Sequence, residues 1–245
     1  MAKISTSTLK DFRALQDTIT VAVNGSSTFE RASQAYTQAV YAAYHESVVL
    51  VRQFATTPYQ ELPLPSRAFV ERLVQEKGLS QKIQNATLIL NLLGTSGVKP
   101  EWNNRSQSKG HSGIPLISAA FIDAIPMMSR LLRELGLGLD WIDRQDTNLV
   151  IKTMGSMSGV FFVRDAAQEV DHLGRKIIAA QDFVKAHDIK SVFGFGGAYL
   201  GTKTFSITIL FLRETIEKGK AEQFAAAMSG FKAQTLELVK THIFG

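Results

Sequence analysis

Residues 191–213 read SVFGFGGAYLGTKTFSITILFLR, and this stretch decides the fold class of the chain. Its two halves are rich in β-branched and aromatic residues, which favour strands. They are joined by Gly201-Thr202-Lys203, where the glycine supplies the positive φ that a hairpin turn needs. From Phe205 to Phe211 every other residue is apolar, which is the period of a strand with one buried face. The stretch therefore predicts an antiparallel hairpin with strands over 191–200 and 204–213.

Helices and strands surround this hairpin without the strict alternation of a doubly wound parallel sheet. Apolar residues at three- and four-residue steps predict helices, and apolar β-branched runs predict strands. The predicted helices span 29–44, 66–77, 118–135, 181–187 and 217–242. The other predicted strands span 47–55, 87–93, 139–142, 147–154 and 159–164. Pro126 should break the third helix. We expect an α+β fold with a mainly antiparallel sheet flanked by the N- and C-terminal helices.

The composition is that of an ordinary folded protein. The chain has 245 residues, of which 45% are hydrophobic and 20% charged, and this balance excludes disorder as the main state. We expect residues 1–27 to form a Ser/Thr-rich lead-in with a short helix around 9–15, and residues 28–245 to form a single domain. There is no Cys, which excludes disulfides, Cys-ligated zinc, iron–sulfur clusters and a thiol nucleophile.

The net charge of +5 is carried by dispersed basic residues and not by a basic stripe. We therefore expect no nucleic-acid partner. The most apolar windows, such as SVVLVRQFA, are far shorter than the about 20 residues that cross a bilayer. The N-terminus MAKISTSTLKDF also lacks the apolar core of a signal peptide. These features predict a cytoplasmic protein with no membrane partner.

Residues 94–113, GTSGVKPEWNNRSQSKGHSG, are the first candidate for a binding site, because long loops are often functional. Trp102 would form an apolar wall and His111 a polar contact. Arg105 could bind a carboxylate or phosphate bidentately, with the amides of Asn103 and Asn104 to orient it. The glycines could let backbone N–H groups approach an anion, although GTSG is not a P-loop. The alternative is a structural loop whose Trp packs on the core and whose Arg pairs with an acid.

Two more stretches carry candidate residues. Residues 161–183, FFVRDAAQEVDHLGRKIIAAQDF, contain Phe161 as a possible apolar wall and Asp165 and Arg175 as polar contacts, or else as ion pairs that brace a loop. The adjacent residues Asp171 and His172 lack the spacing of metal ligands, so we expect no bound metal. Gly196 and Gly197 leave room for a ligand or for a packed helix. Their spacing does not match the dinucleotide fingerprint.

The run HDIKSVFGFGGAYLGTKTFSITILFLRETI, residues 187–216, resembles the closing part of a GAF-type sensor domain. The first predicted helix, followed by SVVLVRQFA and ATLILNLLG, has the element order of such domains, and the resemblance covers roughly residues 28–240. The runs HSGIPLISAAFIDAIPMMSRLL and GRKIIAAQDFV also resemble a family of bacterial sensory modules that occur alone or ahead of histidine-kinase domains. The chain differs from phytochrome-like members in having no Cys for a chromophore, and it lacks a clear cyclic-nucleotide motif.

This GAF/PAS-like resemblance implies a cytoplasmic bacterial module that senses or binds an unidentified small molecule. The ligand would lie non-covalently between the sheet and the 94–135 region. The terminal helices would pair in a homodimer, and a histidine kinase or another signalling protein would be the partner. No cofactor can be named. Two alternatives stay open: an enzyme with His111 and Asp165 as acid–base groups, which we expect less, and a structural partner-binding protein without an enclosed pocket.

Overall fold

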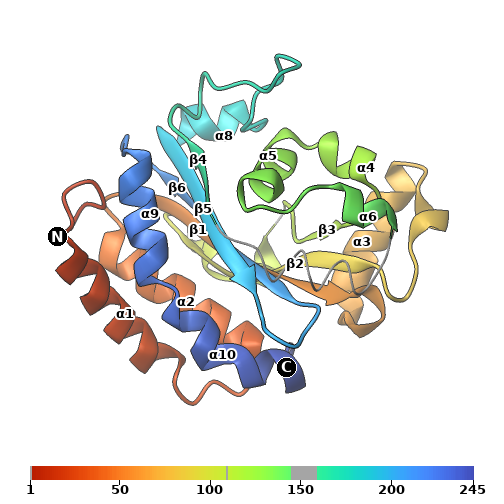
Figure 1. Ribbon diagram of the computed structural model, residues 1–245, viewed down its shortest axis with the longest axis horizontal. Helices are drawn as coiled ribbons and strands as arrows, with labels where there is room; N and C mark the ends of the chain where they lie inside the picture. The colour runs from red at the N-terminus through yellow and green to blue at the C-terminus, as the bar shows by residue number, and fades with distance from the viewer. Residues whose placement is uncertain (1, 109, 145–158) are drawn as a thin grey trace.

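The computed structural model describes residues 2–108, 110–144 and 159–245 (Figure 1). Its centre is a six-stranded sheet in the order β3-β2-β1-β6-β5-β4, with antiparallel neighbours throughout. The strands are β1 Val48–Pro58, β2 Leu88–Gly97, β3 Gly113–Pro115, β4 Val160–Val163, β5 Ser191–Ala198 and β6 Phe205–Leu212. The helices are α1 Leu9–Val23, α2 Phe29–Tyr44, α3 Leu64–Glu76, α4 Ala119–Asp123, α5 Pro126–Glu134, α6 Asp140–Arg144, α8 Gln181–Ala186, α9 Lys218–Ala227 and α10 Gly230–Thr241. The predicted α+β class with an antiparallel sheet is confirmed.

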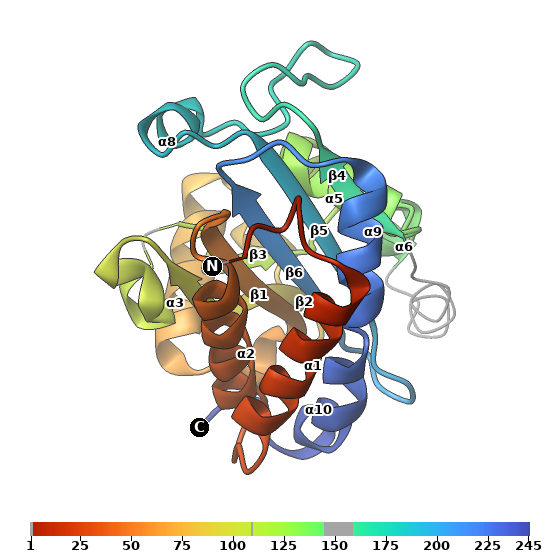
Figure 2. The same ribbon diagram turned by 90° about the vertical axis from the view of Figure 1, so that its left-hand side faces the viewer.

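Helices cover both faces of the sheet (Figure 1; Figure 2). One face packs against α1, α2, α9 and α10, and the other against α4, α5 and α8. Strand alternation divides the core accordingly, because side chains of one strand point alternately to the two faces. In β6, Ile207 and Ile209 join the core under α5, whereas Leu210 and Leu212 join the core under α1 and α2.

Several local predictions are confirmed. Helix α2 starts where Thr28 caps it, its Oγ1 accepting a hydrogen bond from the Arg31 N–H at 3.2 Å. The predicted third helix is split into α4 and α5 at Pro126. The β5–β6 turn has Gly201 at φ +74°.

Other predicted elements were wrong. Residues 139–142 are not a strand: the segment Asp140–Arg144 forms α6, because three apolar residues around Asp140 fit the buried face of a helix as well as that of a strand. The last predicted helix is divided into α9 and α10 at Met228 and Ser229, next to Gly230, a poor helix former. The predicted strand over 147–154 lies outside the described residues.

Strand β2 extends further than predicted, so that GTSG belongs to the sheet and not to the loop. Gly94 stands opposite Gln53, and Gly97 opposite Leu50. A Cβ atom at Gly94 would lie 2.2 Å from the carbonyl oxygen of Ser33 in α2. Gly94 therefore permits close packing of a helix on a strand rather than the approach of an anion.

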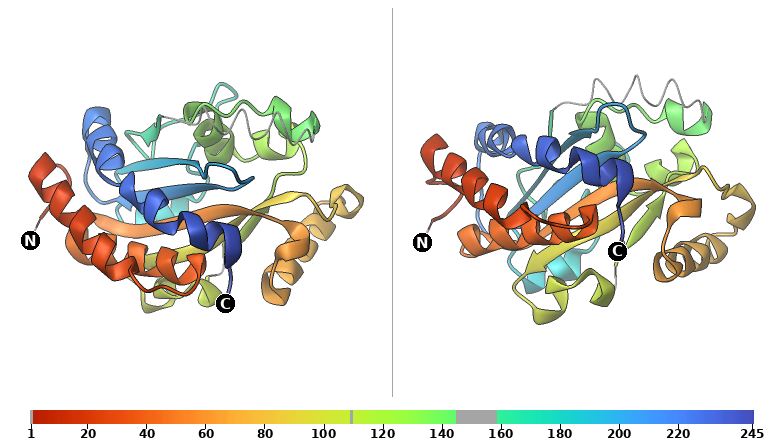
Figure 3. Two further views of the ribbon diagram at one scale, coloured as in Figure 1. Left: turned by 60° about the horizontal axis from the view of Figure 1, so that its bottom comes forward. Right: turned by 90° about the horizontal axis from the view of Figure 1, so that it is seen from below.

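The expected lead-in contains a full helix. α1 is 15 residues long and starts with a capping box between Thr8 and Asp11. Its buried face, which includes Phe12 and Ile19, belongs to the same core as α2, α9 and α10. Figure 3 shows α1, α2 and α10 side by side beneath the sheet. Among the described residues, no helix combines the length and the apolarity that crossing a membrane would require.

Candidate functional site

A cavity of about 360 Å³ lies between the sheet, the residues Trp102, Gly110 and His111, and the segments 125–128 and 177–183. Its lining residues are Leu50, Arg52, Trp102, Gly110, His111, Ile125, Pro126, Met127, Met128, Ile177, Ile178, Ala179, Ala180, Phe183 and Phe211. We call it the Arg52 cavity. Its size is typical of small-molecule sites, and its wall is almost wholly apolar. It lies in the region where the sequence predicts a ligand.

Arg52 is the charged group of this wall. It follows Val51 in the centre of β1, so its side chain points to the face opposite that of Val51. Its Nη1 donates to the carbonyl oxygen of Gly110 at 3.0 Å, and its Nη2 donates to Ser108 Oγ at 3.1 Å. The buried Nε has no partner, and among the described residues no carboxylate pairs with the guanidinium. Burial lowers the pKa of Arg52 to about 10.

His111 and Trp102 lie at the same cavity, so the structure brings these two predicted residues together. His111 has a left-handed backbone, with φ at +50°. His111 is an exposed residue, but neighbouring protein atoms partly desolvate its imidazole ring. This partial desolvation, with the charge of Arg52, lowers the pKa of His111. The Trp102 ring packs edge-on against Phe183, with ring centroids 5.6 Å apart.

The remaining loop candidates have structural partners. Asn103 Oδ1 accepts from the Gly97 N–H at 3.1 Å, and its Nδ2 donates to the Gly97 carbonyl at 3.0 Å. Asn104 Oδ1 accepts from the Ser106 N–H at 2.9 Å. Arg105 forms an ion pair with Glu30 at the start of α2. For these three residues the alternative of a structural loop matches the contacts, and none of them lines the Arg52 cavity.

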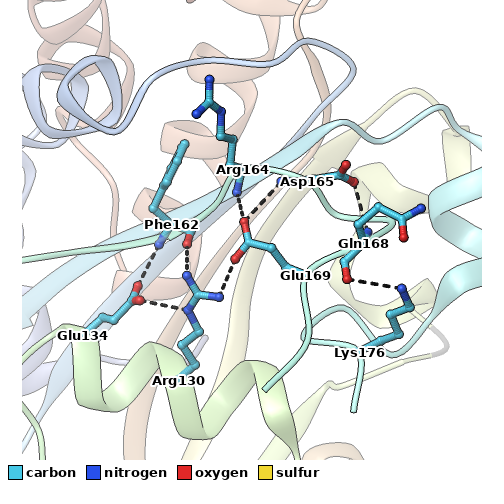
Figure 4. Close-up of polar contacts among 8 residues, drawn as sticks. All are labelled: Arg130, Glu134, Phe162, Arg164, Asp165, Gln168, Glu169 and Lys176. Carbon is cyan, nitrogen blue, oxygen red and sulfur yellow. Dashed lines mark hydrogen bonds and ion pairs between the residues drawn. The ribbon is translucent and has the colours of Figure 1, made fainter. Parts of the chain in front are cut away.

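Arg130 ties α5 to the edge strand β4 (Figure 4). It donates to Glu134 at 2.8 Å, to Glu169 at 2.6 Å and to the carbonyl oxygen of Phe162 at 2.6 Å. Burial alone would lower the pKa of Arg130, but Glu134 and Glu169 outweigh it and raise this pKa. Glu134 also accepts from the Phe162 N–H at 2.9 Å. The network therefore occupies backbone groups of an edge strand, which would otherwise be free to pair with another chain.

Phe161 and Asp165 belong to this structural region. Phe161 is fully buried, and its ring centroid lies 6.0 Å from Arg130 Cζ. Asp165 Oδ1 accepts from the N–H groups of Ala167 at 2.9 Å and Gln168 at 3.0 Å, which fixes the turn after β4. Asp165 lines neither the Arg52 cavity nor the other described cavities, so no shared cavity brings it to His111. The geometry therefore does not favour the acid–base pair of the enzyme alternative.

Arg175 lies at a separate surface cavity of about 360 Å³. Its Nε donates to Asp171 Oδ2 at 2.7 Å, and its Nη2 donates to the carbonyl oxygen of Asp123 at 2.9 Å. These contacts brace the 170–177 loop against α4. Among the residues that the structure describes, no three His, Asp or Glu side chains gather as a metal site.

Gly196 and Gly197 lie in β5, and their neighbours are on the face of the sheet that is covered by α9 and α10. Gly196 lines a second cavity there, below α9 and α10. A Cβ atom at Gly197 would lie 2.1 Å from Lys232 Nζ of α10. The candidate residues Gly196 and Gly197 thus serve a different face of the sheet from Trp102 and His111.

The sequence reasoning missed Arg52 and its neighbour Gln53. The signal was present, because the predicted strand SVVLVRQFA contains one charged and one amide residue between apolar ones. Lys, Arg and Gln are seldom buried unless they have a role or a partner. Arg52 and Gln53, within an apolar strand, therefore indicate a site as clearly as the polar residues of the loop 94–113 do.

Comparison with known proteins gives partial likenesses. No protein-family model and no curated protein matches the chain. One similar solved structure is a phycoerythrobilin-bound GAF domain from a cyanobacterial phytochrome, with 12% identity and a TM-score of 0.45 over 94% of this chain and 98% of that chain. Another is a far-red absorbing dark state with bound biliverdin IXa, with 8% identity and a TM-score of 0.44 over 92% of this chain and 99% of that chain. Likenesses of this size assign no family and no ligand.

Proposed function

We propose that the protein is a small-molecule-binding module whose ligand is an organic anion held non-covalently in the Arg52 cavity. The observation that carries the proposal is the charge of Arg52 at the wall of an apolar cavity, where no carboxylate of the described residues pairs with it. A partly buried cation without a counter-ion is costly, and an anionic ligand would remove that cost. Only two of the five guanidinium N–H donors are used by Gly110 and Ser108, so the others remain for a carboxylate or sulfonate.

The other lining residues determine what kind of non-ionic part the ligand can have. Leu50, Met127 and Ile178 present aliphatic and thioether surface, and Trp102 and Phe183 present aromatic surface. Burying an apolar body here is favoured by the removal of its surface from water. The ligand class that fits is an amphiphilic acid with one anionic group and an apolar or aromatic body.

The function can be tested on the purified chain. Native mass spectrometry should detect the 26.9 kDa protein together with a bound organic acid. Protein emptied by unfolding and refolding should bind the aromatic sulfonate 8-anilinonaphthalene-1-sulfonate saturably, with one site per chain. An empty native protein that also fails to bind this sulfonate contradicts the proposal.

Binding should depend on pH through His111. An anion at the Arg52 cavity favours the protonated imidazole and raises its pKa, so the protein takes up a proton on binding. Affinity for the sulfonate, whose own charge is constant, should therefore rise by roughly threefold from pH 7.5 to pH 5.5. Fluorescence titrations of wild type and His111→Asn check this, because the variant should lose the dependence. The exposed residue His172 provides the control His172→Asn, which should keep it.

We further propose a sensory role for this module, in a bacterial cytoplasm and with a histidine kinase or similar protein as its partner. The support is the resemblance of 187–216 to the closing part of GAF-type domains. The test is a ligand-dependent change in the activity of a kinase encoded beside the protein. If the ligand does not change the kinase activity, the sensory role is wrong and only the binding function remains.

The homodimer is a separate proposal. The apolar stripe that suggested it, which includes Phe224 and Phe231, is buried within the chain itself. A dimer would therefore have to use outer faces of the terminal helices, such as the one where Val21 is 77% exposed. Light scattering should give twice the chain mass of 26.9 kDa, and a monomer mass would refute it.

A further inference from the structure

Gln53 follows Arg52 in β1, and its side chain points to the other face of the sheet. There it lines a second cavity of about 380 Å³, which we call the Gln53 cavity. The cavity lies between β5, β6 and the junction of α9 with α10. Its lining residues are Tyr36, Gln53, Gly159, Val160, Phe195, Gly196, Ser206, Thr208, Glu222, Ala225, Ala226, Met228, Ser229, Phe231 and Lys232. The proposed function of the Arg52 cavity does not involve it.

The floor of the Gln53 cavity carries a buried amide. Gln53 is 1% exposed, and its Oε1 accepts a hydrogen bond from Thr208 Oγ1, its cross-strand neighbour. Thr208 lies 3.4 Å from the hydroxyl of Tyr36, which is also buried. Since Oε1 is used, the Nε2 amide is left to donate, and among the described residues it has no acceptor. Gln53 lines the cavity, so this donor is available to an acceptor on a ligand.

The wall opposite the floor carries a cation. Lys232 of α10 is partly buried, and its Nζ lies directly over the backbone of Gly197. Burial lowers the pKa of Lys232. No carboxylate pairs with this ammonium group among the residues that the structure describes. Glu222, on α9, is an exposed acid on the same lining.

Aromatic rings also line the Gln53 cavity. Phe195, Tyr36 and Phe231 all line the cavity, and the rings of Tyr36 and Phe231 are in contact with centroids 4.4 Å apart. Such walls favour a flat ring, which can stack on them or meet them edge-on. The cavity thus offers a cation, a ring-binding wall and a neutral donor.

We propose that the Gln53 cavity is a second ligand site, for a small aromatic carboxylate. The carboxylate pairs with Lys232, the ring lies against Phe195 and Phe231, and a ring acceptor receives a hydrogen bond from Gln53 Nε2. Two adjacent residues of β1 thereby serve two different sites, one on each face of the sheet.

Three flat probes of nearly equal size test this site by calorimetry on the whole chain. Nicotinate has both the carboxylate and a ring nitrogen that accepts a hydrogen bond. Benzoate lacks the nitrogen, and nicotinamide lacks the charge. Nicotinate should bind with one site per chain, and each of the other two should bind about tenfold more weakly, since each loses one hydrogen-bonded or charged contact.

Variants assign the binding to this cavity. Lys232→Met and Gln53→Leu should each weaken nicotinate binding about tenfold, and Arg105→Met, which removes a guanidinium that lines neither cavity, should leave it unchanged. Lys232 is only partly buried, so its variant keeps the test valid if Gln53→Leu fails to fold. Absence of nicotinate binding, equal affinity for the three probes, or loss of binding in Arg52→Met but not in Lys232→Met would each overturn the proposal. The last of these outcomes would place nicotinate in the Arg52 cavity.

Discussion

Arg52→Met should weaken binding of 8-anilinonaphthalene-1-sulfonate by about ten- to a hundredfold. A hydrogen bond to a charged group contributes on the order of 1.5–3 kcal/mol, and among the described lining residues the guanidinium is the only cation, with His111 neutral. Stability should change by no more than about 1 kcal/mol, because the variant loses two hydrogen bonds to the loop but also removes an unpaired cation. Fluorescence titration and thermal unfolding measure the two quantities on the same samples.

Arg105→Met provides the matched control, since it removes a guanidinium from the loop that the sequence favoured. Arg105 pairs with Glu30 and lies over the ring of Phe244, with its Cζ 5.6 Å from the ring centroid. This variant should keep its affinity within about twofold and lose on the order of 1 kcal/mol of stability. If both variants lost affinity alike, or if Arg52→Met bound normally, the assignment of the anion to Arg52 would be wrong.

Gly94→Ala should be among the most destabilising single changes in the chain, at about 3 kcal/mol. The added Cβ would lie 2.2 Å from the backbone oxygen of Ser33, and backbone cannot rotate aside as a side chain can. Helix α2 would therefore have to move off β2, and overpacking of this kind costs roughly 1–3 kcal/mol or more. The stiffer unfolded chain offsets only about 0.4–1 kcal/mol. Thermal unfolding should show a fall in Tm of roughly 6–12 °C.

Gly110→Ala is the control for this prediction. Gly110 lies in the same glycine-rich stretch, but nothing lies within 4 Å of its added Cβ. Its stability should stay within about 0.5 kcal/mol of wild type. Equal stability of the two variants would show that α2 and β2 are not in backbone contact at Gly94.

The sequence could predict the elements whose periodicity is long and clear. The β5–β6 hairpin, α2 and the break at Pro126 follow from alternation, helical spacing and proline geometry, all of which act within a few residues. The strand predicted over 139–142 was wrong because a segment of four residues is too short to distinguish the period of a strand from that of a helix. β2 was cut short at Gly94 because local rules read a glycine as the end of a strand, whereas here it admits a helix.

The sequence could predict where the candidate site lies, but not which charged residue belongs to it. Trp102 and His111 were expected at a cavity beside the sheet, and both lie there. The sequence favoured Arg105 over Arg52 because loops more often carry function than strands do. Whether an arginine is free for a ligand depends on the acid that pairs with it. Glu30, the partner of Arg105, is 75 positions away in the sequence.

By itself, then, the sequence determined the α+β class, the antiparallel hairpin and the absence of cysteine chemistry, since composition and local period are properties of the chain alone. Only the tertiary structure decided which polar groups are paired. Folding brings Glu30 to Arg105, places no acid of the described residues beside Arg52, and turns Arg52 and Gln53 toward different cavities. The free energy of a buried charge or donor depends on the groups around it in space, and those groups come from distant parts of the sequence.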